Sequence, residues 1–533
     1  MDKINGAVFK QMLESGCNNL NNRKDEINAL NVFPVPDGDT GTNMSLTFSN
    51  GMSEINKSGS EQLPVVAKTL SRGMLMGARG NSGVILSQIF RGFSAAVGEQ
   101  EELDTAAFNA CMLSDSKQAY KAVMRPVEGT ILTVIRESAE SASVYLEDHP
   151  EATLEEYIDV LCKEARASLD RTPELLPVLK EARVVDSGGS GLAAVFDGFR
   201  AFLQGSPILA GAEGVRTEEV RKVESGYTAE FILKLSSQGV HIFREERFRN
   251  ALGRLGSEIR LIVEDDTVKC RINTMTPGEV LNLGQRYGEF KQIRIDNNNE
   301  ERQPSIIDDA APAEDKEFGI IAVAAGDGLK KLFRDYRADI VVSGGQTMNP
   351  STEDFVAAAG MINARNIFIL PNNGNIIMAA KQAADVITDK NIVVLNAVSI
   401  PQGLSACINF DPEYTLEENT AAMNDAISQV TSGAVTYAIK DTTIEGRKIK
   451  RGDYMGLLNN DIVLTHRDMV KATCRLIREM CDEDAAVITL IQGKDTADED
   501  CEKVREFIEK NFEVDIDIQK GSQPVYNFII GVE

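Results

Sequence analysis

Two carboxylates, Asp37 and Asp39, stand two residues apart within residues 31–44, which read Asn-Val-Phe-Pro-Val-Pro-Asp-Gly-Asp-Thr-Gly-Thr-Asn-Met. The two prolines keep the approach extended, and Gly38 and Gly41 allow tight turns and close contact with a ligand. Carboxylates among short oxygen-bearing side chains suit a hard divalent cation with phosphates alongside. The residues alone leave a solvated turn as the alternative.

Three further stretches place small residues just before a helix: 77–83 (Gly-Ala-Arg-Gly-Asn-Ser-Gly), 125–130 and 185–192. Glycines leave room for close backbone approach, and a helix N-terminus attracts anions. Each stretch also has a purely structural interpretation: a glycine turn in the first, an N-cap at Thr130 in the second and an N-cap at Asp186 in the third. The combination with the Asp-Gly-Asp loop favours a phosphate site more than any single stretch does.

The spacing excludes two familiar motifs. If Asp37 is position 1 of an EF-hand loop, position 6 is Thr42 instead of Gly and position 12 is Phe48 instead of Glu. The stretch 77–83 is not a Walker A loop, because no Lys-Ser/Thr follows its glycines.

The stretch 31–44 resembles the signature of the catalytic component of bacterial fatty acid kinase, whose N-terminal domain is similar to the ATP-binding (DhaL-like) domain of dihydroxyacetone kinases. The resemblance implies ATP and Mg²⁺, with two metal ions held by Asp37 and Asp39 as catalytic carboxylates and Asn31 either as a further oxygen ligand or as a residue that contacts the ligands. It also implies that nucleotide phosphates lie at the mouth of a helical barrel. The residues expected around the nucleotide share small size or a hydrogen-bonding group at a helix start: Thr40, Gly41, Thr42, Asn43, Gly80, Asn81, Ser82, Gly83, Thr130, Asp186 and Gly188.

The order of elements predicts a multidomain chain. Residues 1–203 form an all-α helical barrel, because apolar residues recur at helical spacing over 4–19, 62–76, 84–93, 105–123, 130–144 and 154–169. Residues 204–225 and 299–317, rich in Gly, Pro and charge, are expected to be linkers. Residues 226–298 predict a small α/β sandwich in βαββαβ order. Strands and helices alternate over 318–533, which resembles the DegV-like α/β domain of the same kinase family.

The middle domain departs from the family's pattern. In the relatives that it resembles, one cysteine and two histidines can form a metal-like cluster, whereas the matching positions here are Thr228, Arg271 and Asn273. Cys270 is adjacent, but its side chain is expected to point to the opposite face of the strand from Arg271. We therefore expect no such metal site.

The C-terminal domain is expected to dock a partner and to contribute nothing to the ATP site. Its strand ends carry side chains that hydrogen-bond well but are poor acid–base catalysts: Gln346, Asn349, Asn372, Asn373 and Gln402. Such strand ends are where open α/β sheets place ligands or partners. Loop turns alone are the other explanation of these residues.

Composition sets limits on the function. The chain has 533 residues and a formal charge of −25, which disfavours nonspecific nucleic-acid binding. No apolar run is long enough to cross a membrane, and the N-terminus lacks a signal-peptide pattern. The eight cysteines contain no CxxC pair, and the three histidines exclude a His-rich metal site. A cytoplasmic location is expected.

The resemblance implies ATP-dependent phosphorylation of a fatty acid carboxylate. A separate fatty-acid-binding protein would present the acid, the product would be an acyl phosphate for phospholipid synthesis, and the kinase would be a homodimer. The motifs contain no histidine, which is consistent with a carboxylate acceptor because an ionised carboxylate needs no general base. Arg79 could screen phosphate charge or form a surface ion pair. The alternatives are a glycerone (dihydroxyacetone) kinase and a non-catalytic scaffold or regulator.

Overall fold

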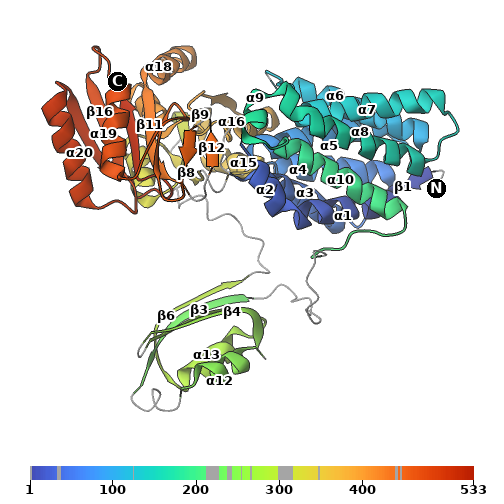
Figure 1. The fold of residues 1–533 in the computed structure, drawn as a ribbon, viewed down its shortest axis with the longest axis horizontal. Helices are drawn as coiled ribbons and strands as arrows, with labels where there is room; N and C mark the ends of the chain where they lie inside the picture. Colours follow the sequence, from blue (N-terminus) through green and yellow to red (C-terminus); the bar gives the residue numbers. More distant parts are fainter. Residues whose placement is uncertain are drawn as a thin grey trace. The chain divides into compact units, whose positions relative to one another are not determined.

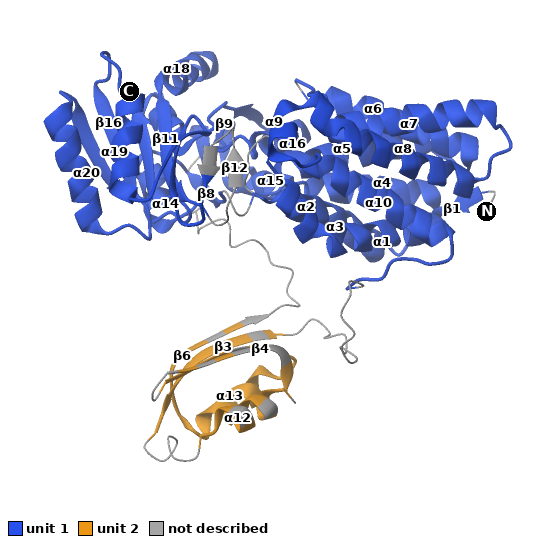
Figure 2. Cartoon of the chain, viewed as in Figure 1, with its two compact units in different colours: residues 1–213, 306–533 blue, residues 214–305 orange. Residues whose placement is uncertain are grey.

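The computed structural model in Figure 1 consists of two compact units. The larger unit combines residues 1–213 with 306–533, and the middle unit is residues 214–305 (Figure 2). The structure describes residues 3–32, 38–123, 125–211, 227–236, 243–253, 255–264, 267–297, 316–345, 349–438, 442–444 and 447–533.

The N-terminal part of the larger unit is helical, as predicted. Aromatic side chains fill its core: Phe9 stacks on Phe93 with ring centroids 5.0 Å apart, and Phe108 meets Tyr157 edge to face. Burial of these rings, together with the aliphatic and Met side chains of the same cluster, drives the packing of the helices. The helices are α1 (Gly6–Asn22), α2 (Lys24–Leu30), α3 (Thr40–Ser58), α4 (Leu63–Met76), α5 (Gly80–Val97), α6 (Thr105–Ala122), α7 (Ile131–Asp148), α8 (Leu154–Leu175), α9 (Pro177–Ala182) and α10 (Ser187–Leu203).

A short ribbon interrupts the helical pattern at the N-terminus. Strand β1 (Lys3–Asn5) pairs antiparallel with β2 (Glu102–Asp104), although the sequence predicted a helix from Ile4. The reason is capping: the Asn5 side chain accepts a hydrogen bond from the Val8 amide at 3.0 Å, which starts α1 at Gly6.

The first predicted linker begins as an ordered segment. After α10 the chain turns back along α1, where the Ile208 amide donates to Ser15 Oγ at 3.0 Å. The Asn18 carboxamide donates to the Ile208 carbonyl at 3.0 Å, and the Gly211 amide donates to Asn22 Oδ1 at 2.9 Å. Residues 212–226 lie outside the described part of the chain.

The middle unit has the predicted βαββαβ order. Its elements are β3 (Tyr227–Leu235), α12 (Glu245–Leu252), β4 (Gly256–Glu264), β5 (Thr267–Thr274), α13 (Pro277–Gln285) and β6 (Gly288–Asn297). The sheet is antiparallel with order β4-β5-β3-β6, and both helices cover the same face (Figure 1). Alternate β3 residues, Ala229, Phe231 and Leu233, are buried in the core of this unit.

The C-terminal domain contains two sheets. The parallel sheet, of order β10-β9-β7-β8, has seven successive buried residues at the end of β7, which is typical of a parallel strand covered on both faces. Its elements are β7 (Lys316–Ala324), α14 (Asp327–Asp335), β8 (Ile340–Ser343), α15 (Thr352–Met361), β9 (Ala364–Leu370), α16 (Ile377–Val386) and β10 (Asn391–Val394). Strand β7 begins two residues before the predicted domain start at 318.

The second sheet is mixed, with order β15-β14-β11-β18-β16-β17. The elements of this part are α17 (Ile400–Ile408), α18 (Leu416–Gln429), β11 (Thr431–Tyr437), β12 (Thr442–Ile444), β13 (Arg447–Ile449), β14 (Tyr454–Leu458), β15 (Asp461–His466), α19 (Met469–Met480), β16 (Val487–Gln492), α20 (Asp498–Asn511), β17 (Asp515–Lys520) and β18 (Phe528–Val532). No helix among the described residues is long and apolar enough to cross a bilayer.

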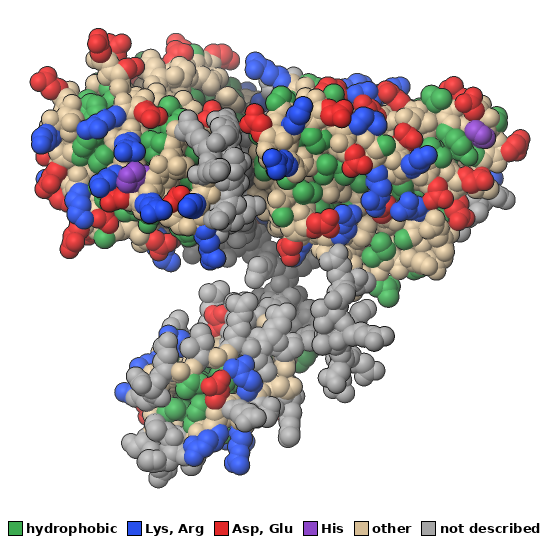
Figure 3. All heavy atoms as spheres, viewed as in Figure 1, with side chains coloured by type: hydrophobic (Ala, Val, Ile, Leu, Met, Phe, Trp, Pro, Cys, Tyr) green, Lys and Arg blue, Asp and Glu red, His purple; other side chains and the backbone are tan. Residues whose placement is uncertain are grey.

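The C-terminal domain packs directly against the helical domain. Ala78 and Val84, around the start of α5, belong to the same buried apolar cluster as Phe355 of α15 and Ala380 of α16. The Gln382 carboxamide of α16 donates to the Leu75 carbonyl at the end of α4, at 2.7 Å. Apart from this junction, acidic, basic and apolar side chains are interspersed over the face of the larger unit in Figure 3.

Asp115 of α6 predicts a pH-dependent stability. It is 2 % exposed, its Oδ1 has no hydrogen-bond partner, and burial raises its pKa well above the usual value. The folded state therefore binds this proton more tightly than the unfolded state, so stability falls as pH rises above the unfolded pKa of about 4 towards the folded pKa.

Residue 115 cannot ionise in Asp115→Asn. We therefore expect the melting temperature of this variant to increase relative to that of the wild type as pH rises from 5 to 8. The gain should be about 2–4 °C for each kcal/mol of ionisation penalty removed. Thermal unfolding followed by circular dichroism measures it, with the exposed Asp170→Asn as the control. Parallel curves of melting temperature against pH for wild type and Asp115→Asn would contradict the prediction.

Candidate phosphate and metal site

The starts of α3, α5, α7 and α10 meet at one end of the helical domain. Thr40 and Ser187, at the starts of α3 and α10, are joined by a hydroxyl–hydroxyl bond of 3.1 Å. Asp186, just before α10, accepts a hydrogen bond from the backbone amide of Ile131 at the start of α7. The structure thus brings together helix starts that lie far apart in the sequence, as the resemblance implies.

Missing side chains allow α3 and α5 to approach closely. A Cβ on Gly80 would collide with the Asn43 carboxamide, and a Cβ on Gly83 would collide with the Thr47 hydroxyl. Gly80 also has a φ of +57°, which favours glycine. The Arg79 amide donates to Thr47 Oγ1 at 3.2 Å, which fixes the turn before α5 on α3.

Asp39 lies at the N-cap position of α3, after Gly38 with its φ of +67°. Its side chain does not cap the helix; Oδ2 instead accepts a hydrogen bond of 2.6 Å from the Asn349 carboxamide of the C-terminal domain. Thr42, in the first turn, exchanges hydrogen bonds with the Asn28 side chain of α2 at 3.0 and 3.1 Å. Gly41 is required there, because a Cβ would collide with the Lys24 carbonyl.

Thr130 and Asp186 are N-caps, as their structural interpretations state. Thr130 Oγ1 accepts from the Leu132 amide at 3.4 Å, and Asp186 Oδ2 accepts from the Gly189 amide at 2.6 Å. Asp186 is 5 % exposed; burial raises its pKa to about 6, although hydrogen bonds from the Gly189 and Ile131 amides oppose the rise.

The four helix starts therefore differ in one respect. The N-cap side chains of α7 and α10 cap their own helices, whereas those of α3 and α5 do not; at α3 the Asn28 side chain instead accepts from the Thr42 amide at 3.1 Å. An anion is therefore favoured at the starts of α3 and α5 over those of α7 and α10. Gly188 and its neighbours then serve packing, since a Cβ on Gly188 would lie 3.2 Å from Ile131 Cβ.

The first turn of α5 is partly occupied by the C-terminal domain. The Asn81 carboxamide donates to Asn375 Oδ1 at 2.9 Å, while Ser82 is half-buried. Arg79 donates from Nη1 to the Asn349 carbonyl at 2.8 Å and lies 3.7 Å from the buried Asp354 carboxylate. The structure thus places Arg79 in an ion pair within the domain junction.

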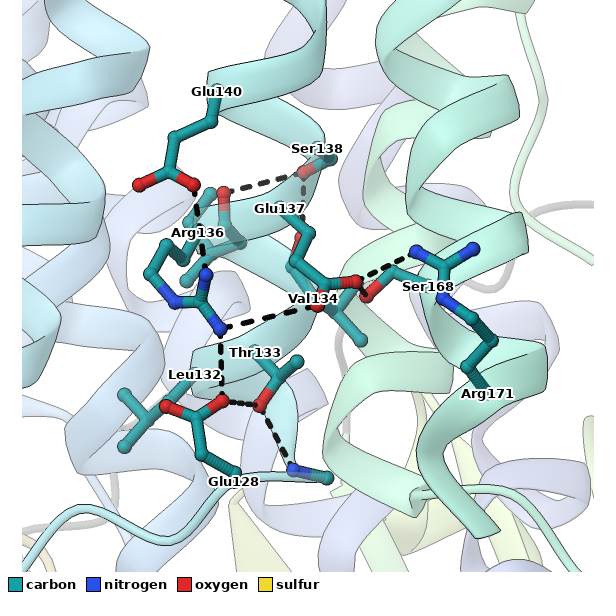
Figure 4. Close-up of polar contacts among 12 residues, drawn as sticks. Glu128, Leu132, Thr133, Val134, Arg136, Glu137, Ser138, Glu140, Ser168 and Arg171 are labelled. Carbon is teal, nitrogen blue, oxygen red and sulfur yellow. Dashed lines mark hydrogen bonds and ion pairs between the residues drawn. The ribbon is translucent and has the colours of Figure 1, made fainter. Parts of the chain in front are cut away.

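A polar network that the sequence motifs did not predict holds the loop before α7 (Figure 4). Glu128 Oε2 accepts from Thr133 Oγ1 at 2.6 Å and from Arg136 at 2.9 Å, and Glu128 Oε1 accepts from Tyr120 at 2.9 Å. The Gly129 amide donates to Thr133 Oγ1 at 2.8 Å. Burial opposes the change, but these hydrogen bonds lower the pKa of Glu128.

The network continues onto α8. Glu137 accepts from Ser168 and from Arg171, both at 2.7 Å, and lies 3.9 Å from Arg136. Its members come from α6, α7, α8 and the stretch 125–130, so it fixes the Thr130 loop relative to three helices. In the sequence, the one sign of this network is that Glu128 lies within the stretch 125–130.

The oxygen groups near Asp39 fit a hard cation. Asn349 Oδ1 is buried and has no hydrogen-bond partner, although its own nitrogen contacts the Asp39 carboxylate. Carboxylate and amide oxygens are the ligands that Mg²⁺ takes in proteins. Among the described residues no three His, Cys, Asp or Glu side chains cluster. Asp37 lies outside the described residues. Asn31 follows α2 and is buried, and its role as a metal ligand stays a prediction.

Two expectations about the C-terminal domain need correction. The ATP site was expected to need nothing from it, but Asn349 contacts Asp39. The polar strand ends were expected to face a partner, but Asn349, Asn372 and Asn373 are buried within the chain. Asn372 donates to the Val323 carbonyl at 3.0 Å, and Gln402 accepts from the Val398 amide at 2.9 Å. Gln346 lies outside the described residues.

Family models match almost the whole chain. The DAK2 domain matches residues 34–201, the middle domain of FakA-like fatty acid kinases matches 224–304, and the C-terminal domain of the same FakA-like proteins matches 319–533. The chain belongs to the FakA-like fatty acid kinase family. This membership confirms the resemblance and the predicted multidomain fold class, and it places the chain among kinases.

Relatives extend over the full length. Protein YloV of Bacillus subtilis is 42 % identical over 552 residues, covering 99 % of each chain, and SERP0792 of Staphylococcus epidermidis is 39 % identical with full coverage of both. Solved structures are more distant. A DegV family protein from Thermus thermophilus (12 % identity, TM-score 0.31) covers 41 % of this chain and 99 % of that one. The dihydroxyacetone kinase of C. freundii (9 % identity, TM-score 0.31) covers 41 % and 48 %. Scores of this size carry no argument about function.

Gly80→Ala should weaken nucleotide binding. The added Cβ collides with Asn43 and lies 3.3 Å from the Asn349 nitrogen, so the turn before α5 must shift. Gly59→Ala is the matched control, because Gly59 has a φ of +63° with nothing within 4 Å of an added Cβ. In both variants the free energy of unfolding should fall by about 1 kcal/mol, because alanine is strained in the left-handed backbone conformation. Titration calorimetry with an ATP analogue and Mg²⁺ should show a several-fold higher Kd for Gly80→Ala and an unchanged Kd for Gly59→Ala. Equal affinities of Gly80→Ala and Gly59→Ala would contradict the prediction.

The middle unit should bind no zinc tightly. In the sheet Thr228 lies opposite Asn273, and neither residue type supplies a soft ligand. Cys270 is buried in the core, and burial raises its pKa to about 12, which disfavours the thiolate that zinc requires. Elemental analysis of tag-free protein should give far less than one zinc per chain. A stoichiometric zinc that is lost in Cys270→Ser would contradict this expectation.

Proposed function

We propose that the chain transfers the terminal phosphoryl group of ATP to the carboxylate of a fatty acid that a separate fatty-acid-binding protein presents, releasing an acyl phosphate for phospholipid synthesis. The observation that carries the proposal is that the starts of α3 and α5, whose N-cap side chains form no capping bond, meet beside Asp39 in a member of this kinase family. ATP supplies the phosphates that such helix starts attract.

The chain's own groups bind and orient the nucleotide. Amides at the starts of α3 and α5 bind phosphate oxygens, and the partial positive charge of both helix ends favours them. Asp39, with Asp37 and Asn31, holds Mg²⁺. When bound, Mg²⁺ neutralises phosphate charge that would otherwise repel both the carboxylates and the acceptor. Phosphoryl transfer requires chiefly this positioning and charge neutralisation.

The acceptor is a carboxylate, which is itself the nucleophile. One carboxylate oxygen forms a bond to the γ-phosphorus while the bond from that phosphorus to the β–γ bridging oxygen breaks, and ADP leaves with the electron pair. No proton has to be removed, so no base is needed. Helix α7 spans 18 residues, about 27 Å at 1.5 Å per residue, and His149 lies beyond its far end from Thr130.

The C-terminal domain is proposed to dock the acyl-carrying partner. Because its helices α15 and α16 pack against α4 and α5, and because Asn349, Asn372 and Asn373 are buried, docking has to use another of its surfaces. Such docking raises the effective concentration of the fatty acid near the nucleotide.

The match to the DAK2 domain favours one second candidate, a glycerone-type kinase acting on a hydroxy-ketone. A single experiment separates the candidates: ATP turnover by the full-length protein with fatty-acid-loaded partner, with dihydroxyacetone, or with neither. Trapping the product with hydroxylamine detects an acyl phosphate. Turnover only with the loaded partner supports the proposal, turnover with dihydroxyacetone favours the second candidate, and no turnover in any arm supports a scaffold.

Asp39→Asn should abolish transfer while the fold persists. The substitution removes the charge yet keeps an oxygen that accepts the Asn349 hydrogen bond, so the domain junction is retained. We expect kcat/KM to fall by about 100-fold or more, because electrostatic stabilisation by the metal is lost. Asp25→Asn, in the first turn of α2, is the control. Activity near that of the wild type in Asp39→Asn, with an unchanged melting temperature, would contradict the role of Asp39 in phosphoryl transfer. The same test applies to Asp37→Ala.

A further inference from the structure

We propose that Asn349, in the C-terminal domain, is a positioning residue of the phosphoryl-transfer site. Its carboxamide nitrogen orients the Asp39 carboxylate, and its carboxamide oxygen faces the magnesium–nucleotide ligand. The inference rests on the proposed function only for the identity of that ligand. Nothing in the family assignment or in the motifs of residues 31–44 points to a residue 310 positions away from Asp39.

The contact between Asn349 and Asp39 is short, and it joins a buried carboxamide to a half-buried carboxylate. Asn349 is 2 % exposed, and its Nδ2 donates to Asp39 Oδ2 at 2.6 Å. Hydrogen bonds to ionised groups are shorter and stronger than neutral ones. The bond restricts the rotation of the carboxylate, which does not fold back to cap α3.

The other end of the same carboxamide is unsatisfied. Asn349 Oδ1 is buried without a hydrogen-bond partner, a costly state for an amide oxygen. Exchanging the two carboxamide atoms does not resolve it, because an amide oxygen would then face the carboxylate oxygen of Asp39. A cation beside Asp39, or a water molecule bound to that cation, satisfies this oxygen. Because the Asn349 carboxamide is neutral, it adds no negative charge that would repel ATP.

The backbone on either side of Asn349 is fastened to the helical domain. The Asn349 carbonyl accepts from Arg79 at 2.8 Å, and an isolated β-bridge joins Arg79 to Ser351. The Thr352 amide then donates to the Ala78 carbonyl at 3.2 Å. The segment 349–352 thus runs along the turn before α5, and Gly80 leaves the space that the Asn349 side chain occupies.

Asn349 makes the C-terminal domain part of the kinase site. Its side chain reaches the Asp39 carboxylate from the other domain. Gln382 lies in the same junction, bonded to the Leu75 carbonyl at 2.7 Å and to Gln88 at 2.9 Å. It therefore provides a control for loss of domain packing without loss of the Asp39 contact.

The test compares full-length wild type, Asn349→Ala, Asn349→Asp and Gln382→Ala. Titration calorimetry measures the Kd of a non-hydrolysable ATP analogue and the Mg²⁺ concentration that gives half-maximal binding. Asn349→Ala should raise both about tenfold, the size expected for losing a hydrogen bond to a charged group. Gln382→Ala should lower the melting temperature and leave the Mg²⁺ requirement unchanged.

The Asn349→Asp variant can be tested without nucleotide. In this variant two carboxylates face each other, and a bound cation relieves their repulsion. Mg²⁺ alone should therefore raise the melting temperature of Asn349→Asp more than that of the wild type. An unchanged or lower Mg²⁺ requirement in Asn349→Ala, or an equal rise in Gln382→Ala, would overturn the proposal. If the wild type binds the analogue but forms no acyl phosphate, the proposed acceptor fails while the role of Asn349 stands. If the wild type binds no analogue, both fail.

Discussion

The start of an α-helix leaves backbone N–H groups without partners, and the structure crowds several such starts into one place. The positive ends of α3, α5, α7 and α10 repel each other unless negative charge or hydrogen-bond acceptors are supplied. Asp186 and Thr130 supply acceptors for α10 and α7 from within the chain. The N-cap side chains of α3 and α5 form no such bond, and Asn28 accepts only from the Thr42 amide of α3, so an external anion is favoured at these two helix starts.

Close approach of the backbones depends on glycine. Gly41 lets α3 lie against α2, Gly80 makes room for Asn43, and Gly83 makes room for Thr47. Larger side chains at these positions would separate the helix starts and widen the space between their amides. Gly80 also leaves room for the Asn349 side chain, so this glycine serves both the anion site and the domain junction.

Much of the fold could be predicted from local patterns, but the site only in part. Apolar periodicity located the helices, and each glycine-rich helix start carries its own local signal; that Thr40, Gly80 and Asp186 are neighbours was implied by the family resemblance. Asn349 carries no such signal: a polar residue after a buried strand looks the same whether it faces a partner or another domain of the chain. Its contact with Asp39 depends on how two domains pack, which apolar patterning within each domain does not specify.

The neutral character of Asn349 bears on how the two domains cooperate. A second carboxylate facing Asp39 would bind a cation tightly, but without the cation the two charges would push the C-terminal domain away. A carboxamide stabilises the junction in either state, because it donates to Asp39 and keeps one oxygen for the ligand. In the proposed reaction the domain that docks the acyl carrier also orients the metal-binding carboxylate. Presentation of the acceptor and assembly of the nucleotide site then depend on the same domain contact.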